Sequence, residues 1–293
     1  MMRGMVEPQA KSEKRVVVVG VGLIGGSVAA AVRHRLPDCQ VVGIGRCEQR
    51  LQAAADAGLL TGWATDVTSE MLSGRCVVVV CLPVHLIATH VRRIAEKASD
   101  DVLITDAGSV KAVICDAVNE HEAASRLFVG AHPIAGGEQG GFEHADADLF
   151  HDKVCVVVAG DATSARKPLV HRTRHFWQHL GCRIVDMTAD EHDRVLALTS
   201  HLPHLMAAVT TTVAGTDNLS LTGSGFRDAT RIAAGDAELW TAIMAGNRAS
   251  VIAAIGRAEE TLADYRKALE QQNDERLLEL LATAAECRRK LSS

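Results

Sequence analysis

Short runs of valine and isoleucine recur along the first two thirds of the chain, and stretches with helical spacing separate them. The runs are RVVVVG (residues 15–20), QVVGIG (40–45), CVVVVCLP (76–83), VLITDAG (102–108), LFVGAHP (127–133), KVCVVVAG (153–160) and CRIVDM (182–187). Their apolar residues do not alternate with polar ones, which is typical of strands buried on both faces of a parallel sheet. Helical stretches lie between them, for example at residues 23–35, 85–98 and 164–180. This order predicts an α/β fold with a doubly wound sheet.

The Val/Ile runs stop at Met187, and the remaining chain has the spacing of helices. We therefore expect a flexible tail at residues 1–14, a sheet domain at 15–187 and an all-α domain at 188–293. The stretch LMAAVTTTVAG (residues 205–215) is strongly apolar and carries no charge. A small helical domain cannot cover such a surface alone, so the sequence predicts a homodimer formed through this domain.

Composition excludes several classes of protein. The net charge of −5 gives no basic surface for a nucleic acid. We expect no membrane span, because no apolar stretch approaches about 18 residues, and the N-terminus lacks the apolar core of a signal peptide. The 8 cysteines form no C-x-x-C pair, and several lie inside apolar runs. They indicate reduced thiols in a cytoplasmic protein rather than a disulfide or zinc framework.

A glycine-rich turn follows the first predicted strand. In VVVVGVGLIGGS (residues 16–27), Gly20, Gly22 and Gly25 have the spacing G-x-G-x-x-G between a strand and a helix. The first glycine permits a tight turn, the second a close approach to a pyrophosphate, and the third close packing of helix on strand. The pyrophosphate would lie at the helix N-terminus, beside Leu23 and Ile24. The motif predicts a dinucleotide site in a Rossmann-type domain.

The end of the second predicted strand indicates which dinucleotide binds. An NAD site usually has an acidic residue there, on the ribose 2′-hydroxyl. This chain has Gly45 followed by Arg46, with Arg50 one helical turn further on. Because a guanidinium binds a 2′-phosphate with paired donors, the sequence favours NADP over NAD. In the alternative interpretation, Arg46 is a solvated loop residue.

A second glycine-rich stretch, GAHPIAGGEQGGFEHADADLF, occupies residues 130–150. Its glycines suit neither a helix nor a strand, and His132 precedes most of them. A loop of this composition beside a histidine is expected to bring its backbone close to a ligand.

Five motifs occur in one order along the chain: GVGLIGGS, DAGSVK (residues 106–111), GAHPIAGGEQGG (130–141), TSHLPH (199–204) and GFRDATRIAAGDAELW (225–240). Together they resemble the prephenate and arogenate dehydrogenase family of tyrosine biosynthesis. The resemblance implies oxidation of a cyclohexadiene 4-hydroxyl, with hydride passing to a nicotinamide and the ring carboxylate leaving as CO2. The products would be 4-hydroxyphenylpyruvate from prephenate or tyrosine from arogenate.

The resemblance also assigns roles to particular residues. His132 would be the base for the 4-hydroxyl, which suits an imidazole near neutral pH. Ser109 would bond to His132 and the hydroxyl, and it could cap the helix that it precedes, either as well or instead. Arg231 would hold the ring carboxylate in paired hydrogen bonds, with Arg227 as a competing candidate. The remaining expected pocket residues are His201, Glu138 and Trp240, although Trp240 could also be a packing residue.

Three alternatives remain at this stage. His201 and His204 lie three residues apart, but no nearby acid or cysteine completes a metal shell, so we expect no metal. Another two-domain NADP-dependent hydroxyacid oxidoreductase would usually carry a catalytic lysine in its helical domain, whereas residues 188–246 contain none. A non-catalytic dinucleotide sensor would need neither His132 nor Arg231.

Overall fold

The structure is a computed structural model that describes residues 13–137, 139–159 and 166–292. It divides into two compact units. The first comprises Met1–Asp193 and Gly235–Asn247, and the second comprises Arg194–Ala234 and Arg248–Ser293. A division at Met187 places helix α10 (Ala237–Gly246) in the helical domain. The structure instead groups α10 with the sheet, because Ile243 and Trp240 pack into a core of the first unit.

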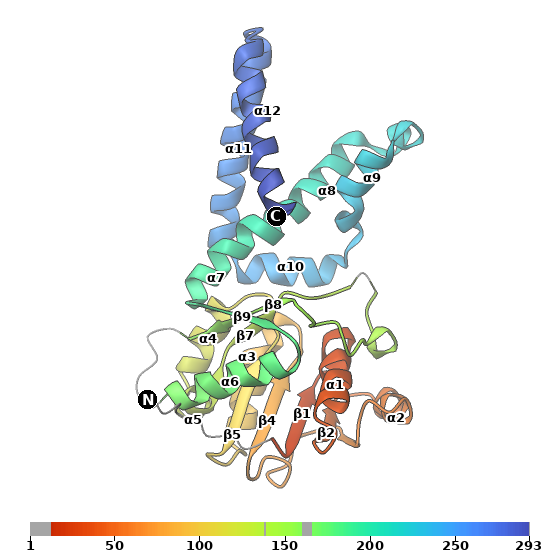
Figure 1. Ribbon diagram of the computed structural model, residues 1–293, viewed down its shortest axis with the longest axis vertical. Coiled ribbons are helices and arrows are strands. Elements are labelled where there is room, and N and C mark those ends of the chain that lie inside the picture. The colour runs from red at the N-terminus through yellow and green to blue at the C-terminus, as the bar shows by residue number, and fades with distance from the viewer. Residues whose placement is uncertain (1–12, 138, 160–165, 293) are drawn as a thin grey trace, which may run out of the picture. The chain divides into compact units, whose positions relative to one another are not determined.

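The first unit is built on a parallel sheet of six strands in the order β3-β2-β1-β4-β5-β6 (Figure 1). The strands are β1 (Arg15–Val19), β2 (Gln40–Ile44), β3 (Gly62–Ala64), β4 (Cys76–Val80), β5 (Val102–Asp106) and β6 (Phe128–Val129). The chain adds strands on one side of β1 and then, from β4 onward, on the other. The order therefore reverses between β1 and β4, where sheets of this type bind ligands at their carboxyl edge.

The last three predicted strands do not simply extend this sheet. The end of the first of them and the whole of the other two form a second sheet in the order β7-β8-β9, with β7 (Ala131–Pro133), β8 (Val154–Val158) and β9 (Arg183–Met187). The run LFVGAHP, predicted as one strand, is divided at Gly130 between β6 and β7. The amide of Val158 donates to the carbonyl of Gly130, and β7 then pairs with β8 in the antiparallel sense. This pairing turns the chain out of the parallel sheet just before His132.

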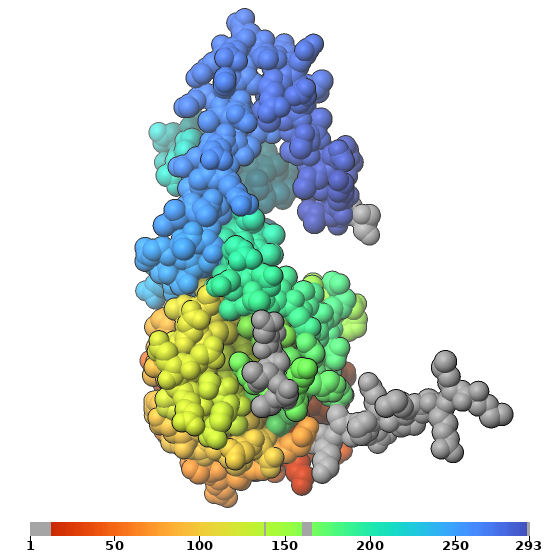
Figure 2. Space-filling view, turned by 90° about the vertical axis from the view of Figure 1, so that its left-hand side faces the viewer, coloured from red at the N-terminus to blue at the C-terminus, as the bar shows by residue number. Residues whose placement is uncertain are grey.

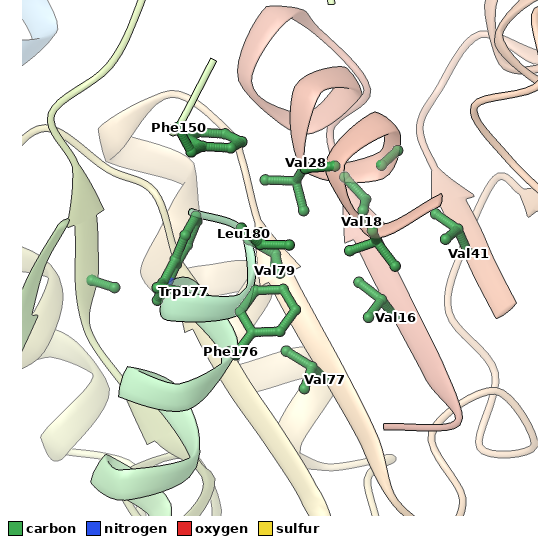
Figure 3. Packing of buried hydrophobic residues seen from close by; sticks show 14 of the residues in the cluster. Val16, Val18, Val28, Val41, Val77, Val79, Phe150, Phe176, Trp177 and Leu180 are labelled. Carbon is green, nitrogen blue, oxygen red and sulfur yellow. The ribbon is translucent and has the colours of Figure 1, made fainter. Parts of the chain in front are cut away.

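Both faces of the main sheet are covered, as the unalternating valine runs predicted. Val16, Val18, Val77 and Val79 face helix α1 (Leu23–Arg35) and helix α6 (Lys167–His179), where they meet Phe176 and Trp177 (Figure 3). The neighbouring strand residues point to the opposite core, beneath α3 (Val84–Ala95), α4 (Ala112–Asn119) and α5 (Glu122–Leu127). Helix α2 (Glu48–Asp56) joins β2 to β3. Alternate valines of the same strand therefore belong to the two cores on opposite faces of the sheet.

The predicted flexible tail at residues 1–14 lies mostly outside the described residues, but its last part is held. Glu13 accepts hydrogen bonds from Arg172 at 2.7 and 2.6 Å. Arg172 also donates to the carbonyls of Asp101 and Cys76. These contacts fix the entry of the chain into β1.

The second unit consists of helices. They are the end of α7 (Ala189–Leu196), a π-helical turn (Ala197–His201), α8 (Leu202–Ala214), α9 (Ser224–Thr230), α11 (Arg248–Glu270) and α12 (Asp274–Arg289). Helices α11 and α12 lie side by side (Figures 1 and 2). The buried apolar cluster of this unit is small and contains Ala197, from the π-helical turn, with Val251 and Ala254 of α11. None of the described helices is long and apolar enough to cross a membrane.

Candidate functional site

The first glycine turn has the geometry of a dinucleotide loop. Gly20 has a φ of +93°, and a Cβ there would collide with the backbone oxygen of Cys81, which follows β4. A Cβ on Gly25 would collide with the backbone oxygen of Gly20. Gly20 therefore permits the turn from β1 into α1 to pass close to the end of β4, and Gly25 permits α1 to lie close to β1.

Gly22 differs from its two neighbours in the motif. A Cβ built on it has no described atom within 4 Å, so space rather than packing surrounds this position. Gly22 is also the N-cap of α1, and it caps the helix without a side chain. The first turn begins with the uncharged Leu23 and Ile24. Backbone N–H groups and the positive end of the helix dipole thus face open space, which fits a pyrophosphate.

The carboxyl end of β2 carries positive charge. Arg46 is exposed and forms no ion pair with any described residue. Arg50 lies 3.6 Å from Glu143, measured between Nη2 and Oε2, and its guanidinium lies 6.0 Å from the centre of the Phe142 ring. Of the two arginines predicted to bind the cofactor, Arg50 therefore contacts the glycine-rich loop, whereas Arg46 faces solvent.

The loop between β7 and β8 lies against α1. A Cβ on Gly26 would come within 3.0 Å of Ala145 Cβ, and a Cβ on Gly137 within 3.3 Å of Leu23 Cδ2. The amide of Asp146 donates to Ser27 Oγ at 3.0 Å. The loop is thus close to the same helix whose N-terminus opens toward the predicted pyrophosphate. Glu138, predicted to lie near the substrate, is outside the described residues.

His132 lies in β7, paired with Val156 of β8. The prediction that it ends a strand of the parallel sheet is wrong, because the chain leaves that sheet at Gly130. Two buried charged side chains, Asp106 and Lys111, form hydrogen bonds with the backbone of the preceding residue, Ala131. Its amide donates to Asp106 Oδ1 at 3.0 Å, and its carbonyl accepts from Lys111 Nζ at 2.9 Å.

Lys111 and Asp106 form an ion pair with each other, and both side chains have 0% exposure. Asp106 Oδ2 also accepts from the amide of Gly108 at 2.9 Å. The ammonium and the carboxylate thus meet each other and backbone groups, as a buried charge requires. Lys111 therefore has a structural role.

His132 contacts a second histidine, His192, in the first turns of α7. His132 Nδ1 lies 2.8 Å from His192 Nε2, and His192 Nδ1 lies 2.7 Å from Asp193 Oδ1. The two rings meet edge to face at 66°. Burial lowers the pKa of His192 below its usual value, although the hydrogen bond to Asp193 opposes that shift. Burial therefore favours the neutral form of His192.

Asp193 in turn is bound to the N-terminus of α4. Its two carboxylate oxygens accept hydrogen bonds from the backbone amides of Lys111 and Ala112 at 2.8 and 2.9 Å. The side-chain amide of Asn247 donates to the backbone carbonyl of Asp193 at 2.6 Å. An acceptor from a distant part of the chain therefore caps α4, and its negative charge suits the helix dipole.

Ser109 does not cap α4, so this alternative for it is wrong. The helix begins at Ala112, its N-cap is Lys111, and the cap uses no side chain of its own. Ser109 is half-buried in the loop before the helix and forms no hydrogen bond with a described residue. Its proposed role toward His132 remains a prediction.

The other predicted residues are divided between the units. Trp240 lies on α10, half-buried, and packs against a core of the first unit. His201 and Arg231 belong to the second unit. His201 ends the π-helical turn with 1% exposure, whereas Arg231 is exposed at the start of a 3-10 helix (Arg231–Ala234) that contacts α8.

His204, three residues after His201, is 6% exposed on α8, and burial lowers its pKa. Arg227, the competing candidate for the carboxylate, is exposed on α9 and donates weakly to the carbonyl of Thr222 at 3.4 Å. Within residues 13–137, 139–159 and 166–292, no group of three or more histidine, cysteine or acidic side chains is arranged to hold a metal.

Sequence reasoning missed His192 and Asp193. They belong to the run DEHD, which follows the end of β9 after two further residues. An acidic and histidine-rich run just beyond the carboxyl end of a strand is a signal that could have found them. The contact with His132 could not be read from the sequence, because 60 residues separate the two histidines.

Comparison with known proteins gives a consistent result across the chain. Residues 28–186 match the family model for the nucleotide-binding domain of prephenate dehydrogenase, and residues 188–283 match the model for its dimerization domain. A cyclohexadienyl dehydrogenase from Zymomonas mobilis is 32% identical over 273 residues, covering 91% of this chain and 92% of that one. A prephenate dehydrogenase from Bacillus subtilis is 28% identical over 280 residues, covering 93% and 75% of the two chains.

Solved structures agree with these relatives. Prephenate dehydrogenase from A. aeolicus, in complex with hydroxyphenyl propionate and NAD+, superposes with a TM-score of 0.87 at 27% identity, covering 97% of this chain and 100% of that one. Synechocystis arogenate dehydrogenase gives a TM-score of 0.79 at 27% identity, with coverage of 94% and 99%. The glycine turn, the open N-terminus of α1 and both family matches lead to one conclusion: the chain belongs to the prephenate dehydrogenase family and is a dehydrogenase that uses a nicotinamide dinucleotide.

Proposed function

We propose that this enzyme oxidises and decarboxylates prephenate, arogenate or both, with NADP as the preferred cofactor. Relatives named for either substrate match the chain over most of its length, which supports the reaction and retains both substrates. The oxidation would supply 4-hydroxyphenylpyruvate or tyrosine directly.

A single buried imidazole carries this proposal. His132 is 9% exposed and lies in the same compact unit as the dinucleotide loop. The Lys111–Asp106 pair is bound to the backbone of the preceding residue, so the backbone position from which the His132 ring extends is fixed on β7. A base with a defined position is what removal of a hydroxyl proton requires.

In the proposed reaction the imidazole takes the proton of the 4-hydroxyl while the hydrogen on the same carbon leaves as hydride. The bound nicotinamide supplies the hydride acceptor. The ring carbonyl so formed draws electrons from the bond to the carboxylate, and CO2 leaves. The ring oxygen, now a phenolate, takes the proton back from His132. The base therefore ends the cycle in the state in which it began.

We propose substrate contacts for the other predicted residues. The guanidinium of Arg231 would bind the ring carboxylate until CO2 leaves, since it offers paired donors. His201 would meet the side-chain end of the substrate, where prephenate and arogenate differ. Ser109 would bond to the 4-hydroxyl, and Trp240 would line the pocket. Glu138 keeps the role suggested by the family resemblance.

The preference for NADP rests on charge at the end of β2. Arg46 is exposed there without an ion pair to a described residue, and Gly45 stands where an NAD enzyme usually has a carboxylate. A 2′-phosphate would find a cation and no repelling anion at this position. Arg50, one turn further on, would add a second cation from its place beside Phe142.

We also propose that the protein is a cytoplasmic homodimer formed through the second unit. The helices of that unit expose many large apolar side chains, including Val209 at 50%, Val213 at 81% and Ile252 at 62%. Val209 and Val213 are one turn apart on α8, so they form a continuous apolar strip. A second copy of the chain would cover it, consistent with the name of the matching domain family.

His132→Asn is expected to lower kcat by about 10²- to 10⁴-fold, because it removes the proton acceptor. Dinucleotide affinity should stay near the wild-type value, since the glycine turn is unchanged. Steady-state rates and fluorescence titration with NADPH measure the two effects. His179→Asn, the same change at an exposed site on α6, is the control. Nearly full turnover in His132→Asn would contradict the assignment of the base.

Arg46→Ala is expected to weaken NADP binding by about 10- to 100-fold, since a hydrogen bond to a charged group contributes about 1.5–3 kcal/mol. Binding of NAD should hardly change. Isothermal titration with both dinucleotides measures the difference. Arg33→Ala removes the same charge from an exposed site on α1 and serves as the control. Equal losses for NADP and NAD would show that Arg46 does not read the 2′-phosphate.

Sedimentation equilibrium is expected to give a mass of twice the 31.2 kDa of one chain. Val213→Glu should shift the protein toward monomer, because a charge would then be buried at the contact. Val113→Glu makes the same change at an exposed residue of the first unit and should leave the dimer intact. A monomeric wild-type protein, or a dimer indifferent to Val213→Glu, would refute this surface.

A further inference from the structure

A chain of three buried side chains extends from His132 into the protein. His132 is 9%, His192 0% and Asp193 3% exposed, so water does not compete for their hydrogen bonds. His132 Nδ1 meets His192 Nε2 at 2.8 Å, and His192 Nδ1 meets Asp193 Oδ1 at 2.7 Å. All three residues lie in the first unit. The order of the contacts determines where the protons are.

Both carboxylate oxygens of Asp193 are within hydrogen-bond distance of nitrogen atoms. They face two backbone N–H groups, those of Lys111 and Ala112, and Nδ1 of His192. An ionised carboxylate is an acceptor at every one of these contacts. Asp193 is therefore the carboxylate, and His192 Nδ1 carries a hydrogen.

The tautomers of the two rings follow from this carboxylate. Burial and the nearby Lys111 disfavour the charged form of His192 more than Asp193 and Asp106 favour it, so its pKa is lowered and the neutral ring is the favoured form. A neutral imidazole has one N–H, so His192 Nε2 is an acceptor. The hydrogen shared with His132 must then belong to His132 Nδ1. In neutral His132 the lone pair lies on Nε2.

We propose that His192 and Asp193 are positioning residues for the base. They hold His132 as the Nδ1–H tautomer, so that Nε2 takes the proton of the substrate hydroxyl, and they stabilise the imidazolium that results. The inference rests on the proposed function for the source of that proton. The tautomer itself is independent of any substrate.

The proton transfer has a simple balance. The O–H bond of the substrate breaks and an N–H bond forms at His132 Nε2, which leaves His132 with two N–H groups and one positive charge. Its Nδ1–H continues to donate to His192. The negative charge of Asp193, one ring away, lowers the energy of this state. The proton leaves again from Nε2 when the ring oxygen becomes a phenolate.

A purely structural role for the pair explains less of the geometry. Capping α4 requires the carboxylate of Asp193, but it does not require His192. The ring of His192 fills the space between the cap and His132 with one acceptor and one donor, each within 2.8 Å of its partner. That alternation is the arrangement that orients a catalytic imidazole behind an acid.

Asp193→Asn is the most direct variant. Asp193 Oδ1 accepts both from the amide of Lys111 and from His192 Nδ1, whereas Oδ2 accepts only from the amide of Ala112. The amide oxygen of the variant is therefore expected at the Oδ1 position, where it keeps two of the three hydrogen bonds and the Nδ1–H tautomer of His132. What the variant loses is the negative charge that stabilises the imidazolium. Asp190→Asn makes the same change at an exposed residue in the first turn of α7 and is the matched control.

Two measurements test the proposal on the full chain. In ¹⁵N–¹H correlation spectra of the histidine side chains, His132 should be the Nδ1–H tautomer in the wild type and in Asp193→Asn. Steady-state kinetics should show kcat lower by about tenfold or more in Asp193→Asn, with little change in KM, because the charge behind the imidazolium is lost. Asp190→Asn should match the wild type in both. A wild-type spectrum with hydrogen on Nε2 of His132 would overturn the proposal.

A second variant covers the case in which Asp193→Asn does not fold. His192→Gln leaves the cap of α4 intact, and its amide oxygen can still accept from His132 Nδ1–H. We expect the tautomer to survive and kcat to fall about tenfold or more, because the charge of Asp193 no longer reaches the imidazolium. Unchanged kcat would overturn the proposal. A wild type that shows the Nδ1–H tautomer but oxidises neither substrate would support the tautomer and refute the proposed function.

Discussion

Lys111 and Asp106 are an ion pair from which water is excluded, and both are also bound to the backbone of the residue before His132. The pair joins the end of β5 and the start of α4 to β7, and so determines where the second sheet leaves the first. Removing one partner would leave an uncompensated buried charge, at a cost of about 3–5 kcal/mol. The position of the base and the stability of the fold thus depend on the same contact.

Two helix N-termini at this edge differ in what lies at their positive ends. The positive end of α4 is occupied by the carboxylate of Asp193, which is also the last member of the chain behind His132. The positive end of α1 begins with glycine and uncharged side chains and has space at Gly22. The fold therefore uses one dipole to orient its base and leaves the other for the phosphates of the cofactor.

Local patterns in the sequence predicted much of this arrangement. The bounds of α1 and the starts of β1, β2 and β4 follow from valine runs and glycine spacing, which depend on neighbours in the chain. The break of LFVGAHP at Gly130 and the capping of α4 by Asp193 do not, because each is decided by a partner more than 20 residues away. The capping of α4 by Ser109, one of the two roles expected of it, is wrong for this reason. His192 was missed because its partner, His132, lies 60 residues away on β7.

The central claim is that this chain oxidises a cyclohexadiene acid with a nicotinamide dinucleotide. Its most direct test is the initial rate of reduced dinucleotide formation with prephenate and with arogenate, each against NADP and NAD, together with the CO2 released. We predict turnover with at least one substrate, one CO2 for each dinucleotide reduced, and a higher kcat/KM with NADP. Absence of turnover in all four combinations, with dinucleotide binding intact, would contradict the account.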